Sequence, residues 1–133
     1  MGNGTSLGKV RGLGSAHEGA HHWLVQRFTA VGNLVLMIWL IASIVMLPDL
    51  GYATVTSWLS APVPATAMVL LIVSTFWHAR LGLQVLIEDY VHDAGMKFGV
   101  ITLLNLAVIA GGAFGIFAVA RLALSSASLG GAA

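Results

Sequence analysis

The sequence predicts an all-α membrane protein with three transmembrane helices. Of its 133 residues, 58% are hydrophobic and only 8% are charged, and the mean hydropathy is +0.92. A soluble domain carries about 25% charged residues, so this chain has too little polar surface to face water on all sides. Its three long apolar stretches do not alternate as barrel strands do. This composition excludes an ordinary soluble enzyme, a nucleic-acid-binding protein and a disordered chain.

The first helix is expected at residues 25–47, around the charge-free stretch Phe28–Leu47. At about 1.5 Å of rise per residue, this stretch crosses a hydrocarbon core of ~30 Å. Pro48 and Asp49 end it. The segment that follows, residues 48–63, is rich in Gly, Ser and Pro and is expected to be a loop.

The second and third helices are expected at residues 64–90 and 97–122. The second carries polar residues in its later half, whereas the third is free of charge until Arg121. Gly111 and Gly115 form a G-x-x-x-G pattern on the third helix. Two small residues at this spacing let a neighbouring helix approach closely, so we expect them to serve packing.

The chain is expected to form one membrane-anchor domain, residues 1–133, with residues 1–24 as an N-terminal cytoplasmic segment. No internal repeat divides it. The sequence contains no Cys, so it cannot form a disulfide, a thiolate metal site or a cysteine-ligated iron–sulfur cluster.

The basic residues predict how the chain is oriented in the membrane. Lys9, Arg11 and Arg27 precede or begin the first helix, and Lys97 lies between the second and third. The connection between the first two helices has no Lys or Arg. Because basic loops stay on the cytoplasmic side, we expect a cytoplasmic N-terminus and a periplasmic C-terminus. Arg121 alone counts against this orientation.

His78 is the most unusual residue, because its place in the second helix puts it near the middle of the membrane. An ionisable side chain there costs about 2.5–3.5 kcal/mol. It either bonds to a neighbouring helix, relays protons or ligates a haem. Gly82 lies four residues on and shares its face, which leaves space for a flat macrocycle or a close helix. A second haem ligand would come from a partner subunit, although Met37 lies at a similar depth and stays possible.

Two arginines have both structural and functional interpretations. Arg80 is expected on the opposite side of the helix from His78, where it reaches towards the surface or pairs with Glu88 or Asp89. Arg27 is either a positive-inside anchor or a clamp on an anion such as a haem propionate.

The inner end of the second helix has two interpretations as well. Its residues Glu88, Asp89 and Tyr90 are what a solvated helix end with an interfacial aromatic contains. They also suit a quinone pocket, because a Tyr hydroxyl can donate to a quinone carbonyl and a carboxylate can deliver protons.

These residues resemble a known family, the hydrophobic membrane anchor subunit of succinate dehydrogenase (the small cytochrome b anchor of respiratory complex II). The pattern H-x-x-x-G-x-x-x-x-x-x-D-Y matches at His78, Gly82, Asp89 and Tyr90. The run at residues 21–27, HHWLVQR, is also similar to the family, as are the chain length and the three helices.

The resemblance implies specific roles for five residues. His78 would be an axial ligand of haem b, with the other His supplied by a sister anchor subunit. Tyr90 would hydrogen-bond a ubiquinone carbonyl, and Asp89 would support that pocket or its protons. Arg27 and His21 would lie near the haem propionates. Arg80 stands where the enteric version has an aromatic residue, so the surroundings of the haem edge differ.

The resemblance also implies the chain's partners. A flavoprotein carrying FAD would oxidise succinate in the tricarboxylic acid cycle, and an iron–sulfur subunit would pass electrons to ubiquinone at the bacterial inner membrane. This chain would bind those subunits and catalyse nothing alone. A quinol:fumarate reductase anchor and a haem-free three-helix membrane scaffold remain the alternative functions.

Overall fold

The computed structural model describes the backbone of residues 16–130 and the side chains of residues 20–124. The described chain is helical apart from short connections. Its four helices are α2 (Ala16–Met46), α3 (Tyr52–Ser60), α4 (Pro62–Tyr90) and α5 (Ala94–Gly130). Three of them are long enough and apolar enough to cross a membrane: Ala20–Met46, Pro62–Tyr90 and Ala94–Leu124, with hydropathies of 2.2, 1.5 and 2.2. The prediction of three spanning helices is confirmed.

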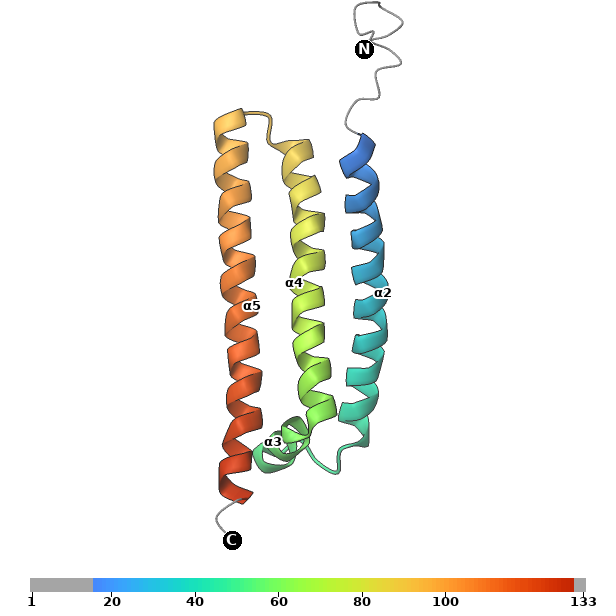
Figure 1. Cartoon of the computed structure of the whole chain (residues 1–133), viewed down its shortest axis with the longest axis vertical. Helices are drawn as coiled ribbons and strands as arrows, with labels where there is room; N and C mark the ends of the chain where they lie inside the picture. Colours follow the sequence, from blue (N-terminus) through green and yellow to red (C-terminus); the bar gives the residue numbers. More distant parts are fainter. Residues whose placement is uncertain (1–15, 131–133) are drawn as a thin grey trace, which may run out of the picture.

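The three long helices lie side by side in one layer, with α4 in the middle (Figure 1). Helix α4 packs against α2 on one side and α5 on the other. Within the described residues, no Cα atom of α2 lies within 8 Å of a Cα atom of α5. The start of α2 and the α4–α5 connection lie at one end of the layer, and α3 lies across the other end. The chain therefore forms an open row of helices and leaves both faces of α4 for other molecules.

The prediction of a loop at residues 48–63 is wrong, because this segment contains α3. Ser60, one of the residues that indicated a loop, and Thr56 beside it bond to carbonyls of α3 itself. Ser60 Oγ donates to the Ser57 carbonyl at 2.6 Å and Thr56 Oγ1 donates to the Tyr52 carbonyl at 2.7 Å. Leu59, only 5% exposed, is the buried residue of α3, which packs against α4 and α5. A nine-residue helix thus forms because it can bury an apolar side chain on its neighbours.

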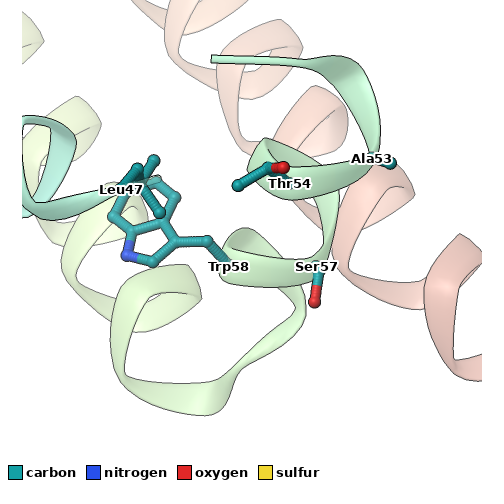
Figure 2. Close-up of a pocket in the computed structure, with 5 residues that line it drawn as sticks. All are labelled: Leu47, Ala53, Thr54, Ser57 and Trp58. Carbon is teal, nitrogen blue, oxygen red and sulfur yellow. The ribbon is translucent and has the colours of Figure 1, made fainter. Parts of the chain in front are cut away.

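Helix α3 is connected to the rest of the chain at two more points. Trp58 stacks on Trp39 of α2, with ring centroids 5.9 Å apart and an interplanar angle of 23°. Before α3, Asp49 Oδ1 accepts a hydrogen bond from the Gly51 amide at 2.7 Å. Two hydrogen bonds lower the pKa of the Asp49 carboxyl below its usual value. The larger effect comes from the Thr54 side chain and the smaller from the Gly51 amide. Figure 2 shows Trp58 beside Leu47 at a shallow hollow of about 460 Å³.

The bounds of two helices, α2 and α5, also differ by several residues from those predicted. Helix α2 begins at Ala16 rather than at residue 25, and α5 runs from Ala94 to Gly130 rather than over 97–122. Apolar content marks only the part of a helix that crosses the membrane, whereas the helix continues wherever its caps allow. At the start of α5, Asp93 Oδ1 accepts from the Met96 amide at 2.7 Å, which is the bond of an N-cap.

The G-x-x-x-G pattern packs against α4, as expected. A Cβ built on Gly111 would lie 2.6 Å from a ring carbon of Phe76, and one on Gly115 would lie 3.2 Å from Ile72. Any larger side chain at Gly111 would therefore have to displace Phe76. The two glycines let the axes of α4 and α5 approach closely.

Few side chains are buried within the described residues. The core comprises only Leu59, Leu71, Leu81 and Val119, whereas long rows of Leu, Ile, Val and Phe are exposed. Exposed apolar surface of this extent marks contact with lipid or with another protein. The layer is therefore built to be covered from outside.

Candidate functional site

The contact between α2 and α4 is made by a ladder of small and polar residues. A Cβ on Gly32 of α2 would lie 3.5 Å from Ser74 Oγ of α4. One turn further along α4, the His78 ring meets Thr29. One turn beyond that, a Cβ on Gly82 would lie 3.9 Å from a side-chain atom of Gln26. The two helices run antiparallel, so successive contacts involve increasing residue numbers in α4 and decreasing residue numbers in α2.

His78 is held in this ladder by one hydrogen bond. Its Nδ1 lies 3.0 Å from Thr29 Oγ1, and both side chains are half-buried. Within residues 20–124, no further hydrogen bond of the ring is found. The second ring nitrogen, Nε2, is thus the one left for another ligand. The interpretation of His78 as a residue bonded to a neighbouring helix is correct as far as Nδ1 is concerned.

Gly82 lies on the same face of α4 as His78, as the four-residue spacing predicts. Both residues face α2, and among residues 20–124 the atom found within 4 Å of a Cβ on Gly82 is Nε2 of Gln26, at ordinary contact distance. An alanine would fit there, whereas a larger side chain would meet α2. Gly82 therefore leaves the space beside His78 free of side-chain atoms from α4.

The contacts of Arg80 correct one expectation. Its guanidinium does not pair with Glu88 or Asp89. Instead, Arg80 Nε donates to Asn105 Oδ1 of α5 at 2.6 Å, and the guanidinium carbon lies 5.6 Å from the centre of the Trp77 ring. Residues two positions apart in a helix point about 200° apart around its axis. Arg80 therefore faces α5, whereas His78 faces α2.

A groove of about 610 Å³ lies beside Arg80, between α4 and α5. Its lining is mostly apolar, and Arg80 and Asn105 are its most polar members. The lining residues are Val73, Phe76, Trp77, Arg80, Asn105, Val108, Ile109, Gly112, Ala113 and Ile116. This groove is separate from the face of α4 that holds His78.

Asp89 and Tyr90 lie at the end of α4, away from His78. Tyr90 is 77% exposed and Asp89 is exposed as well. Twelve residues of helix separate Tyr90 from His78, which corresponds to about 18 Å. Next to them, Glu88 accepts a hydrogen bond from Gln84 Nε2 at 2.8 Å, and its carbonyl accepts one from Lys97 Nζ at 3.0 Å. The structure thus presents two distinct polar places, one within the helix layer and one at its end.

Arg27 and His21 are not brought to His78 by this chain. The Arg27 guanidinium carbon lies 5.2 Å from the centre of the Trp23 ring, and Arg27 is exposed. Since Arg27 lies two residues from Thr29, it is on roughly the opposite side of α2. His21 is exposed too.

The sequence analysis missed the neutral polar residues that connect the helices. Thr29 and Ser74 join α2 to α4, since Ser74 Oγ donates to the Thr29 carbonyl at 3.3 Å. Asn105 joins α5 to α4, and Asn33 accepts a long bond of 3.4 Å from Thr75. A signal was present, because Ser, Thr and Asn inside apolar helices commonly bond across helix contacts. Which residues would pair across 25 to 49 positions could not be read from it.

The arrangement offers one imidazole nitrogen within a layer of membrane helices. Among residues 20–124, no group of three or more His, Cys, Asp or Glu residues could hold a metal ion. A metal bound at His78 would therefore need a ligand from outside this chain or a macrocycle that supplies most of the coordination.

The fold and the site define a multi-pass helical membrane protein that holds one histidine between two of its helices. A family model described as "Succinate dehydrogenase/Fumarate reductase transmembrane subunit" matches residues 1–120. The chain belongs to this family. The match confirms the resemblance found in the sequence.

Individual relatives agree with the family match. The succinate dehydrogenase hydrophobic membrane anchor subunit of Rickettsia conorii is 31% identical over 99 residues, which are 74% of this chain and 79% of that protein. The subunit of the same name from Paracoccus denitrificans is 28% identical over 119 residues, covering 88% and 90%. The Rickettsia bellii subunit is 32% identical over 83 residues, covering 62% and 66%. These relatives are membrane anchors of an enzyme complex.

Proposed function

We propose that this chain is the membrane anchor subunit of a succinate:quinone oxidoreductase. The chain helps to bind a haem b and a quinone, and the complex passes electrons from succinate to the membrane quinone pool. The observation that carries the proposal is the half-buried His78, whose Nδ1 is bonded to Thr29 while Nε2 stays available. The family membership supplies the class of complex.

In this proposal His78 is an axial ligand of haem b. The residues fit the group, because an imidazole with one nitrogen bonded to the protein is the usual form of a haem-ligating histidine. When bound, the haem supplies one-electron chemistry. A sister cytochrome b anchor would supply the other His that holds the haem and would cover an exposed face of the layer. Arg27 and His21, both exposed on α2, would hold the haem propionates.

The quinone site lies at the end of α4. The Tyr90 hydroxyl donates a hydrogen bond to a ubiquinone carbonyl oxygen, and Asp89 accepts and releases protons from the aqueous side. Both side chains are exposed, so an incoming quinone can reach them. Because both residues lie far from His78 along α4, proton transfer to the quinone takes place at the end of the layer and not within its apolar interior.

The orientation completes the proposal. With a cytoplasmic N-terminus and a periplasmic C-terminus in a bacterial inner membrane, the end of the layer that carries Tyr90 faces the cytoplasm. The iron–sulfur subunit docks there and delivers electrons from the FAD of the flavoprotein. The chain alone is not catalytic, since succinate oxidation takes place in those partners.

The test is a reduced-minus-oxidised spectrum of the detergent-purified complex, with succinate as reductant and fumarate as control. A b-type band together with quinone reduction is expected, and His78→Ala should remove or loosen the haem. A complex without haem and without succinate-dependent reduction would leave a haem-free scaffold as the function. An unchanged haem content in His78→Ala would exclude His78 as the ligand.

A quinol:fumarate reductase anchor is the second candidate, because the family description names both enzymes. The two share this architecture and differ in the direction of electron flow. Comparing the rates of succinate oxidation by quinone and fumarate reduction by quinol in the same preparation separates them.

A further inference from the structure

The hydroxyl oxygen of Thr29 lies within hydrogen-bonding distance of three polar atoms, although the hydroxyl has only one proton. Its Oγ1 lies 2.9 Å from the Val25 carbonyl and 3.1 Å from the Gln26 carbonyl, and it donates to them. The same oxygen lies 3.0 Å from His78 Nδ1. A hydroxyl has one proton and two lone pairs. Carbonyl oxygens only accept, so in this geometry the Thr29 hydroxyl donates to the backbone of its own helix.

We propose that Thr29 is a positioning residue that fixes the tautomer of His78. When the Thr29 proton points at the Val25 and Gln26 carbonyls, as the distances allow, Thr29 Oγ1 acts as the acceptor for the imidazole. Nδ1 therefore carries the hydrogen and donates to Thr29, and Nε2 is left with a lone pair. In the opposite tautomer Nε2 would carry the hydrogen and could not bind a metal.

The backbone of Thr29 is held as well. Ser74 Oγ of α4 donates to the Thr29 carbonyl at 3.3 Å. Ser74 and His78 are four residues apart, so they lie on one face of α4. Thr29 is thus bonded to α4 twice, once through its carbonyl and once through its hydroxyl. These bonds set both the position and the rotation of the acceptor that His78 needs.

The inference deepens the proposed haem site and rests on it. An acceptor on the remote N–H of a ligating imidazole makes the metal-bound nitrogen more basic, and loss of such a partner typically costs 10–100-fold in metal affinity. A more basic imidazole favours the ferric state. Removal of the Thr29 hydroxyl should therefore weaken haem retention by roughly 10–100-fold and raise the haem midpoint potential.

The experiment compares variants in the purified complex. Thr29→Val keeps the shape but removes the acceptor, and Thr29→Ser keeps the hydroxyl. Thr102→Val is the matched control, because Thr102 donates to the Phe98 carbonyl of α5 at 2.8 Å and lies on the exposed surface. The readouts are haem per flavin under limiting haem supply, the reduced absorbance band and the midpoint potential. We expect a change in Thr29→Val, recovery in Thr29→Ser and none in Thr102→Val.

The outcomes separate this inference from the function on which it rests. If His78→Ala loses the haem while Thr29→Val keeps wild-type haem content and potential, the ligand stands and the positioning role is overturned. If His78→Ala keeps its haem unchanged, the ligand role itself is wrong.

A second measurement needs no variant. In the reduced, diamagnetic complex labelled with ¹⁵N-histidine, NMR should show a strongly hydrogen-bonded proton on Nδ1 of His78. A proton on Nδ1 without that bond would overturn the role of Thr29 even if Thr29→Val fails to assemble.

Discussion

The two ionisable side chains in the middle of the helix layer, His78 and Arg80, each have a neutral polar partner. His78 bonds to Thr29, and Arg80 bonds to Asn105 on the opposite side of α4. An intramembrane ionisable group without a partner is expensive, which explains why neutral polar residues stand across each helix contact. At the residue scale, the site is therefore defined as much by Thr29 and Asn105 as by the two ionisable residues.

Tyr90→Phe should lower quinone reduction while leaving succinate oxidation by an artificial dye nearly intact. The substitution removes one hydroxyl at an exposed position and no contact within the described chain. A lost neutral hydrogen bond of about 0.5–1.5 kcal/mol corresponds to about 2- to 10-fold in rate. Parallel assays with ubiquinone and with the dye measure the difference. An equal fall in both would show that Tyr90 supports assembly instead.

Asn105→Leu should destabilise the chain, because it leaves the Arg80 guanidinium without the acceptor 2.6 Å away. A hydrogen bond to a charged group contributes about 1.5–3 kcal/mol. Asn33→Leu is the control, since Asn33 accepts only a 3.4 Å bond from Thr75, and such bonds in membranes average about 0.6 kcal/mol. Unfolding of the purified complex in increasing denaturing detergent compares the two. Equal loss in both variants would contradict the special role of Asn105.

At the scale of elements, helix contacts depend on small residues at the points of closest approach. Gly111 and Gly115 admit Phe76 and Ile72 of α4, and Gly32 admits Ser74. Since lipid tails are as apolar as the helices themselves, association relies on close packing and on interhelical hydrogen bonds. The α4–α5 contact combines this packing with the Arg80–Asn105 bond, whereas the α2–α4 contact has the bonds of Thr29 and Ser74.

Gly111→Val should separate α4 from α5, because even a Cβ there would lie 2.6 Å from Phe76. Overpacking of this kind costs about 1–3 kcal/mol. Gly99→Val makes the same change on the same helix, where no atom lies within 4 Å of the added Cβ. Thermal unfolding of the complex should show a clear drop for the first variant and little for the second. A similar drop in both would assign the effect to helix propensity alone.

The sequence predicted the elements better than their contacts. Apolar length was sufficient for the three spans, and the spacing of His78 and Gly82 was sufficient for their shared face. Helix α3 was missed because Ser and Thr residues commonly favour loops. In this segment their hydroxyls instead bond to carbonyls of the helix itself. For Arg80 the sequence left two possibilities, reaching to the surface or pairing with Glu88 or Asp89. Its partner Asn105 was not foreseen because it is neutral and lies on another helix.

At the scale of the whole molecule, the row of helices places one set of features at each end. The start of α2 and the α4–α5 connection lie together, while α3 lies at the far end (Figure 1). The proposed orientation therefore assigns Arg27 and Lys97 to the cytoplasmic side and α3 to the periplasmic side.

The absence of Cys from the sequence allows a direct test of this orientation. A single cysteine at His92, exposed in the α4–α5 connection, should react with a membrane-impermeant maleimide only after the cells are opened. A single cysteine at Ser57, exposed on α3, should react in intact cells. The reverse pattern would invert the topology and remove Tyr90 from the cytoplasmic surface.

The separation of α2 from α5 has a consequence for how the chain is made. Helix α2 leaves the ribosome first, and before α4 is synthesised it can contact α3, through the stacking of Trp39 on Trp58. Once α4 is in the membrane, every residue of the Thr29–His78 contact is present, because α5 contributes nothing to it. The histidine can thus acquire its hydrogen bond during translation, before the third span has been inserted.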